Sequence, residues 1–137
     1  MAILDYEYDA ETLPIEVKRG LDFLYEAVDR KAACAAWADC FSKDNFISMN
    51  GVTTTGIPAA QERLEKRWAT MDRSVHVVEK VSVARTTPLT LNINGTLQIR
   101  LINGEEKNAT WTGEQIYVEE DGRQKIAQYT VNLIFHD

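Results

Sequence analysis

Residues 74–102 read SVHVVEKVSVARTTPLTLNINGTLQIRLI, and this stretch decides the fold class of the chain. Its β-branched residues on both sides of Pro88 are typical of two long strands, because proline interrupts a ladder of backbone hydrogen bonds. Asn94-Gly95, in the middle of the second strand, indicates either a hairpin turn or a bulge. The stretch therefore predicts the beginning of a large sheet.

Two more strands are expected nearer the C-terminus, at residues 107–118 and 125–135. Two-residue turn signals, Asn103-Gly104 and Asp121-Gly122, precede them. Short connections of this kind join antiparallel strands, whereas parallel strands need long crossovers. The second half of the chain therefore predicts a meander of antiparallel hairpins.

The first half is predicted to be mainly helical. After an N-terminal arm at residues 1–13, apolar residues recur at three- and four-residue spacing over residues 15–28, which is typical of an amphipathic helix. We expect a second helix at residues 31–42, a short hairpin at residues 46–55 and a third helix at residues 59–71. Helices grouped before a run of strands indicate an α+β layout.

The predicted architecture is a cone-shaped, curved antiparallel sheet wrapped around about three N-terminal helices, with an internal pocket. Long strands with bulges twist and bend, and a bent sheet leaves room beneath it. We expect a single domain over residues 1–137, because domains commonly contain about 100–150 residues.

Composition and charge disfavour several functions. The net charge of −6 disfavours non-specific binding to nucleic acid and to anionic membranes, because both require a positive field. No apolar stretch approaches the ~20 residues of a membrane helix, and the first residues do not resemble a secretory signal. We therefore expect a cytoplasmic protein in which Cys34 and Cys40, placed in one helix, are reduced and unpaired.

Metal and cofactor chemistry is not expected. Two histidines and two unfavourably spaced cysteines do not supply a closed metal site. The sequence contains no phosphate-binding loop, dinucleotide fingerprint or nucleophile elbow. Any reaction at the pocket should therefore be cofactor-independent.

Two stretches resemble the SnoaL-like branch of the nuclear transport factor 2-like superfamily. AWADCFSKDNFISMNGVTTTGIPAAQERL (residues 36–64) resembles its second helix, short strand and third helix, and GEQIYVEEDGRQKIAQYTVNL (residues 113–133) resembles its last hairpin. His76 and the closing YTVNL are similar to small fungal-type members. With the order of elements, the resemblance covers nearly the whole chain.

The resemblance implies a conical barrel with a deep pocket, and a homodimer formed through the outer face of the sheet. It also implies isomerases, cyclases, dehydratases and epoxide hydrolases of small molecules, or pure binding modules, so the fold does not settle the function. Ketosteroid-isomerase-like members carry an Asp at the end of the short strand, but here that region reads Ser48-Met49-Asn50. This departure disfavours their proton shuttle.

Four residues are candidates for catalysis. His76 is a possible acid or base near pH 7, although the alternation along its strand leaves open whether it faces the pocket or the outer face. Tyr117 and Tyr129 are possible hydrogen-bond donors to a developing oxyanion, or simply packed aromatics. Glu114 becomes an acid or base if it is buried, and is otherwise a solvated surface group.

The substrate-binding candidates are mostly large and apolar. They favour a hydrophobic ligand, although aromatic residues at such spacings are more often plain core. These residues are Trp37, Phe41, Met49, Trp68, Trp111 and Gln115.

Two functions remain open from the sequence. The first is a cofactor-independent isomerase, cyclase or dehydratase acting on a hydrophobic small molecule, in natural-product biosynthesis. The second is a non-catalytic module that binds a small molecule or assembles as a dimer, which the missing inner Asp favours.

Overall fold

The structure is a computed structural model that describes residues 5–136 of the 137-residue chain. Within these residues three α-helices and six strands are present. The helices are α1 (Ile15–Val28), α2 (Cys34–Ala38), which follows a 3₁₀ turn at Lys31–Ala33, and α3 (Ile57–Trp68). The strands are β1 (Phe41–Met49), β2 (Val52–Thr55), β3 (Met71–Thr86), β4 (Leu89–Leu101), β5 (Glu106–Glu120) and β6 (Arg123–His136).

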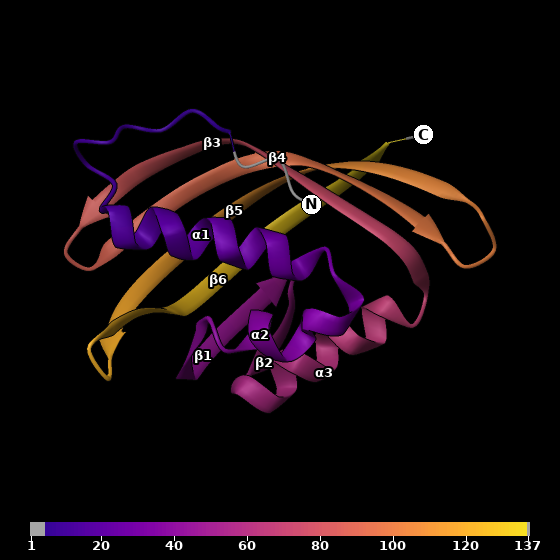
Figure 1. Cartoon of the computed structure of the whole chain (residues 1–137), viewed down its shortest axis with the longest axis horizontal. Coiled ribbons are helices and arrows are strands. Elements are labelled where there is room, and N and C mark those ends of the chain that lie inside the picture. Colours follow the sequence, from indigo (N-terminus) through magenta and orange to yellow (C-terminus); the bar gives the residue numbers. More distant parts are fainter. Residues whose placement is uncertain (1–4, 137) are drawn as a thin grey trace.

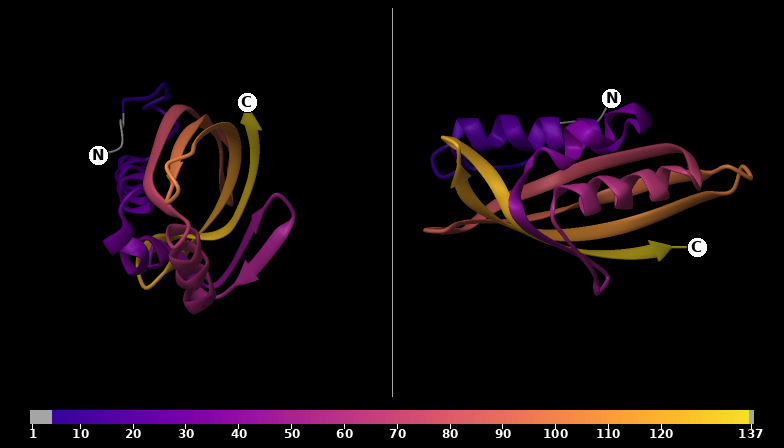
Figure 2. Two further views of the ribbon diagram at one scale, coloured as in Figure 1. Left: turned by 90° about the vertical axis from the view of Figure 1, so that its right-hand side faces the viewer. Right: turned by 90° about the horizontal axis from the view of Figure 1, so that it is seen from below.

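The strands form one curved sheet in the order β2-β1-β6-β5-β4-β3. Figure 1 shows β3 and β4 arching over α1, β5 and β6 running obliquely behind it, and α2, α3 and the β1–β2 hairpin below. The two further views show the same sheet curling on itself, with α1 and α3 across its open side (Figure 2). The α+β class and the curved sheet predicted from sequence are confirmed.

The sheet is mixed, and this corrects the expectation of a purely antiparallel one. β1 pairs with β6 in parallel, with Ile47 opposite Tyr129, while the other ladders of the described residues are antiparallel. The hairpin signals between later strands are local, whereas β1 meets the last strand of the chain. A pairing of such long sequence separation leaves no turn signal.

The curvature has an identifiable cause near Gly95. β4 runs through this position without turning, and the register of β3 against it shifts between Val78 and Lys80. Of the two alternatives, the bulge is therefore observed and the turn is not. A Cβ atom at Gly95 would collide with the backbone oxygen of Val77 and lie 2.9 Å from Cζ2 of Trp111, so the close approach requires glycine.

The second and third helices end earlier than predicted. α2 stops at Ala38, and Phe41 already belongs to β1, because the backbone N–H of Ile126 donates to the carbonyl of Cys40 at 3.1 Å and starts the parallel pairing. Cys40 therefore lies outside the helix, and both cysteines are free. α3 begins at Ile57 with Pro58 in its first turn, and Met71 already starts β3.

The described part of the N-terminal arm packs on the sheet. Glu7 exchanges backbone hydrogen bonds with β3, donating to Glu79 at 3.0 Å and accepting from Val81 at 2.9 Å. The side chains of Tyr6 and Leu13 are buried. Residues 1–4 of the predicted arm lie outside the described residues.

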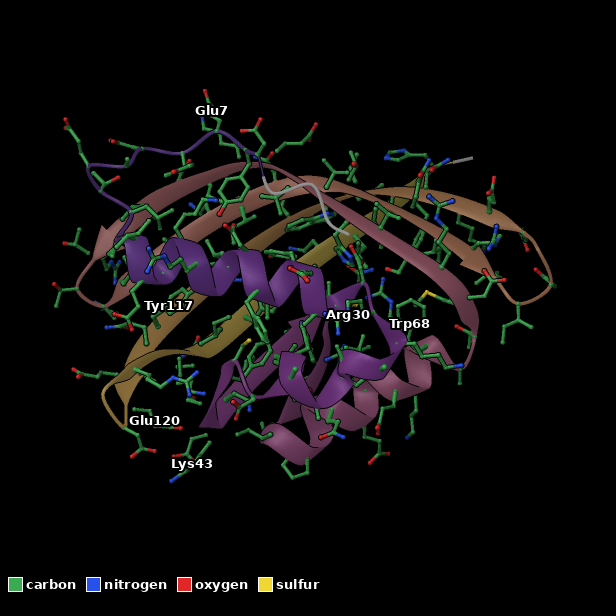
Figure 3. The ribbon with its side chains drawn as sticks, in the orientation of Figure 1. Glu7, Arg30, Lys43, Trp68, Tyr117 and Glu120 are labelled. Atoms are coloured by element: carbon green, nitrogen blue, oxygen red, sulfur yellow. The ribbon has the colours of Figure 1, made fainter. Side chains whose placement is uncertain are left out.

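The core lies between the helices and the concave face of the sheet. Trp68 joins α3 to the end of α1, since its indole N–H donates to the carbonyl of Val28 at 3.3 Å. Figure 3 shows Trp68 beside the end of α1, and Lys43 with Glu120 at the opposite edge. Among the described helices, none has the length and apolar character needed to cross a membrane.

Candidate active site

A cavity of about 170 Å³ lies between α1, α3, β1 and the concave face of the sheet. Most of its lining is apolar, including Val28, Trp37, Ile47, Met49, Leu64 and Val131. Five polar side chains also line it: Tyr25, Arg63, Arg67, His76 and Tyr129. The hollow interior expected from the sequence is therefore present, and ionisable groups reach it.

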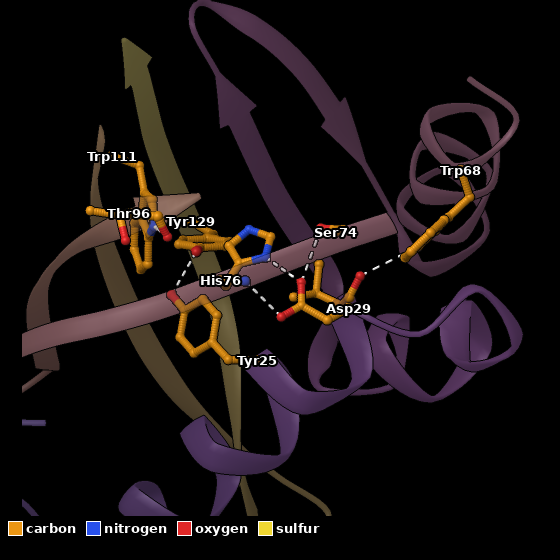
Figure 4. Close-up of polar contacts among 9 residues, drawn as sticks. Tyr25, Asp29, Trp68, Ser74, His76, Thr96, Trp111 and Tyr129 are labelled. Carbon is orange, nitrogen blue, oxygen red and sulfur yellow. Dashed lines mark hydrogen bonds and ion pairs between the residues drawn. The ribbon is translucent and has the colours of Figure 1, made fainter. Parts of the chain in front are cut away.

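Asp29 and His76 form a buried pair at the wall of this cavity (Figure 4). Asp29 is the first residue after α1, and His76 points inward from β3 between the inward-facing Ser74 and Val78. The distance from Oδ1 of Asp29 to Nδ1 of His76 is 2.6 Å, and the two side chains are only 6% and 9% exposed. Such a short contact in a low-dielectric interior holds the ring firmly.

The carboxylate of Asp29 defines how the imidazole is used. It accepts three hydrogen bonds: from the backbone N–H of His76 at 2.7 Å, from Oγ of Ser74 at 3.0 Å, and from Nδ1 of His76. Because a carboxylate oxygen is the natural acceptor at this contact, we assign Nδ1 as the donor, which leaves Nε2 as the second ring nitrogen. In this tautomer the neutral ring has its lone pair on Nε2, and such a nitrogen beside a cavity can act as a general base.

Two tyrosines face the same cavity and share a hydrogen bond. The hydroxyls of Tyr25, on α1, and Tyr129, on β6, are 2.7 Å apart. Burial raises the pKa of Tyr129 to about 12 and that of Tyr25 well above its usual value. Both phenols therefore stay neutral near pH 7. One of their two O–H protons is used in the shared hydrogen bond, so one hydroxyl at a time is free to donate to a substrate oxygen.

Aromatic rings surround the imidazole. The ring centres of Tyr25 and Trp111 are each 6.0 Å from that of His76, and the Trp111 ring is tilted edge-on to it. The indole N–H of Trp111 donates to the carbonyl of Thr96 at 3.0 Å, which holds the ring in place. The base is thus positioned by packing as well as by Asp29.

Two arginines of α3 reach the cavity and differ in their contacts. The guanidinium of Arg63 donates to the carbonyls of Ile47 (3.3 Å) and Val52 (2.8 Å) and to the hydroxyl of Thr54 (3.4 Å), and so ties α3 to the β1–β2 hairpin. The guanidinium of Arg67 makes no hydrogen bond or ion pair with any of residues 5–136. Burial lowers the pKa of Arg67, and the nearby negative charge of Asp29 offsets part of that decrease.

The residues predicted from sequence fall into three groups. His76, Tyr129, Trp37, Met49 and Trp111 line the cavity. Phe41, Trp68 and Gln115 are buried behind its wall.

Tyr117 and Glu114 lie away from the cavity. Tyr117 lines a separate depression of about 370 Å³ and donates to Oε1 of Gln115 at 2.6 Å. Glu114 is exposed on the outer face of the sheet. These positions do not support the catalytic roles expected for the two residues.

Asp29, Tyr25 and Arg67 were not predicted as site residues. From the sequence, Asp29 was interpreted only as the end of a helix, although its position there could have indicated a functional role. An acidic residue at a helix C-terminus faces the negative end of the helix dipole, so it needs another reason to be there. The contact itself joins residues 47 positions apart, which local periodicity cannot indicate.

Across residues 5–136, no three His, Cys, Asp or Glu side chains are grouped so that they could hold a metal ion.

Comparison with solved structures identifies the fold. The chain superposes on a candidate aromatic ring hydroxylase of Novosphingobium aromaticivorans with a TM-score of 0.82 and 14% identity, covering 95% of this chain and 96% of that one. A candidate scytalone dehydratase of the same organism gives a TM-score of 0.79 at 15% identity, covering 90% and 85%. A hexachlorocyclohexane dehydrochlorinase gives 0.73 at 16% identity, covering 89% and 88%.

Other matching structures are described as NTF2-like or as having a ketosteroid isomerase-like fold. At these identities the likeness shows the fold alone. A scan against protein-family models finds no match, and a search of curated proteins finds none either. The superfamily-level resemblance read from the sequence is thus confirmed as a fold.

Proposed function

We propose that this protein is a cofactor-independent enzyme that removes a proton from carbon in a hydrophobic small molecule, as a lyase or an isomerase. The observation that carries this proposal is the buried Asp29–His76 pair at the wall of an apolar cavity. A buried carboxylate destabilises the fold unless it is paired. Asp29 is paired with Nδ1 of His76, and this pairing leaves Nε2 available to a molecule in the cavity.

Each polar group has a role in the proposed reaction. Nε2 of His76 accepts the proton from carbon, and the carboxylate of Asp29 stabilises the imidazolium that forms. Within the Tyr25–Tyr129 pair one hydroxyl donates to the other, and the second donates to the oxygen on which negative charge develops. In an elimination, the C–H electron pair forms the new double bond as the leaving group departs with its own pair. In an isomerisation, His76 returns the proton to another carbon.

Two structural neighbours support the elimination form. The names of two neighbours, a candidate scytalone dehydratase and a hexachlorocyclohexane dehydrochlorinase, denote the elimination of a small molecule from a substrate. Dehydration or a similar elimination is therefore our first choice, ahead of cyclisation. We further propose that the chain is a small fungal-type member of the SnoaL-like branch. A role in natural-product biosynthesis and a cytoplasmic location are part of the same proposal.

Proton exchange with solvent tests the proposal without knowledge of the natural substrate. Small cyclic ketones and β-hydroxy ketones are incubated with the protein in D₂O, and loss of the α-proton signal is followed by NMR. We expect exchange with the wild type and at least 100-fold slower exchange with His76→Gln. His136→Gln is the matched control, because this histidine is exposed near the C-terminus. Binding without exchange, or equal exchange by the two variants, would instead favour a non-catalytic binding module.

We also propose a homodimer through the outer face of the sheet. That face carries exposed polar side chains, among them Gln98, Gln128 and Asn132. Light scattering tests this proposal, and a monomer at all concentrations would contradict it.

A further inference from the structure

The charges around the cavity do not cancel. The carboxylate of Asp29 is engaged by three hydrogen bonds from β3, and the guanidinium of Arg63 is held by two carbonyls and a hydroxyl. Arg67 is the remaining cation at the cavity, and its guanidinium has no hydrogen bond or ion pair within residues 5–136. A half-buried cation that is not directly paired is costly, and the nearby charge of Asp29 offsets only part of the desolvation of Arg67.

The position of Arg67 suits a group that enters with the ligand. It lines both the inner cavity and an open groove that continues outward past Met49, Leu133 and Phe135. Its guanidinium therefore stands where a molecule passes from the surface into the cavity. Arginine in such a position is suited to carboxylates, because its planar fork matches two oxygen atoms.

The volume of the cavity limits what accompanies that carboxylate. Apolar cavities of about 150 Å³ are large enough to bind benzene. The cavity measures about 170 Å³ and its walls are mostly aliphatic and aromatic. One six-membered ring therefore fits inside, and a polycyclic skeleton does not unless it extends along the groove.

We propose that Arg67 binds a carboxylate of the substrate, and that the substrate is a small monocyclic carboxylic acid. The reaction of this substrate depends on the proposed function, whereas the binding of its carboxylate by Arg67 does not. The ring occupies the apolar cavity, where its C–H bonds face His76, and the carboxylate stays at the junction with the groove. Arg67 thus determines which class of molecule enters and how it is oriented.

Binding of two matched probes tests the inference independently of turnover. Benzoate and benzamide have the same ring and nearly the same shape, but only benzoate is charged. Each is titrated into ¹⁵N-labelled protein, and the indole signals of Trp37 and Trp111, both at the cavity, report binding. We expect benzoate to bind wild-type protein at least tenfold more tightly than benzamide.

Substitution of Arg67 should remove the discrimination. Arg67→Gln is expected to weaken benzoate at least tenfold and to leave benzamide unchanged. Lys66→Gln is the matched control, because it removes the same charge from the exposed side of α3, where Lys66 pairs with Glu62. If Arg67→Gln does not fold, Arg67→Lys should still weaken benzoate severalfold, since a lysine cannot bind both oxygens in the same way.

Three results would overturn the inference. They are equal affinity of the wild type for the two probes, an equal loss of benzoate binding in Lys66→Gln, and no saturable shift of the cavity signals by benzoate. His76→Gln separates this inference from the proposed function. Benzoate should still bind that variant, so failed catalysis and failed carboxylate recognition give different results.

Discussion

Replacing Asp29 by asparagine is expected to reverse the tautomer of His76 while the fold persists. Oδ2 of Asp29 accepts from the backbone N–H of His76, whereas Oδ1 faces Nδ1 and the hydroxyl of Ser74. The backbone N–H needs an acceptor, so the single oxygen of asparagine should keep the place of Oδ2. Its NH₂ group then faces Nδ1. A donor in that place requires Nδ1 to accept, and the ring proton moves to Nε2.

The size of the change follows from the hydrogen bonds involved. A hydrogen bond to a charged group contributes about 1.5–3 kcal/mol, which corresponds to roughly ten- to hundredfold preference for a proton on Nδ1. A neutral bond in the variant contributes about 0.5–1.5 kcal/mol in the opposite direction, or roughly two- to tenfold preference for Nε2. The Nδ1–H form should therefore change from the dominant to the minor species.

Long-range ¹H–¹⁵N spectra of the imidazole rings measure the tautomer directly. The chain contains two histidines, and His136 is exposed with Nε2 3.0 Å from Oγ1 of Thr110, so its signals should not change in the variant. Turnover should fall by up to about 10⁴-fold, because Nε2–H cannot accept a proton. A proton on Nε2 in the wild type, or an unchanged tautomer in the variant, would refute the assignment of His76 as a base oriented by Asp29.

Two further predictions concern stability. Gly95→Ala should destabilise the protein by about 3 kcal/mol or more in urea unfolding, at the upper end for overpacking, because its Cβ would collide with the backbone oxygen of Val77 as well as lie against the ring of Trp111. Gly20→Ala is its control and should be neutral or stabilising, since nothing lies within 4 Å of the added atom. Burial raises the pKa of Tyr129 from 10.0 to about 12, so its stabilisation is complete below pH 10 and lost as the pH rises towards 12. The free energy of unfolding should fall by about 1.4 kcal/mol at pH 11 from this group, and Tyr129→Phe should remove that part of the decrease.

The sequence predicted the elements whose signals are local. The apolar stripe of α1 and the turn signals between the last strands lie within a few residues, and these elements appear close to the expected bounds. The end of α2 was wrong because the pairing of β1 with β6 joins Phe41 to Ile126, and no short window contains both. The parallel ladder was missed for the same reason.

The candidate site shows the same limit. Alternation along β5 placed Trp111, Gln115 and Tyr117 on one face, which is the buried one, and by the same parity Glu114 had to face outward. His76 was a candidate because histidines are rare here, but its orientation needed the register of β3 against β4. Asp29 became a site residue only when the end of α1 was placed beside that strand.

The cavity and its polar groups result from the same packing. Gly95 on β4 and Gly113 on β5 face inward and have no side chain. The rings of Trp111 and Tyr129 occupy the space that side chains there would fill. Cζ2 of Trp111 would be 2.9 Å from a Cβ at Gly95, and Cε1 of Tyr129 would be 3.1 Å from one at Gly113. The rings therefore lie against the sheet rather than across the interior. A larger residue at either glycine would push a ring toward His76, so the bend of the sheet, the volume of the cavity and the position of the base depend on one another.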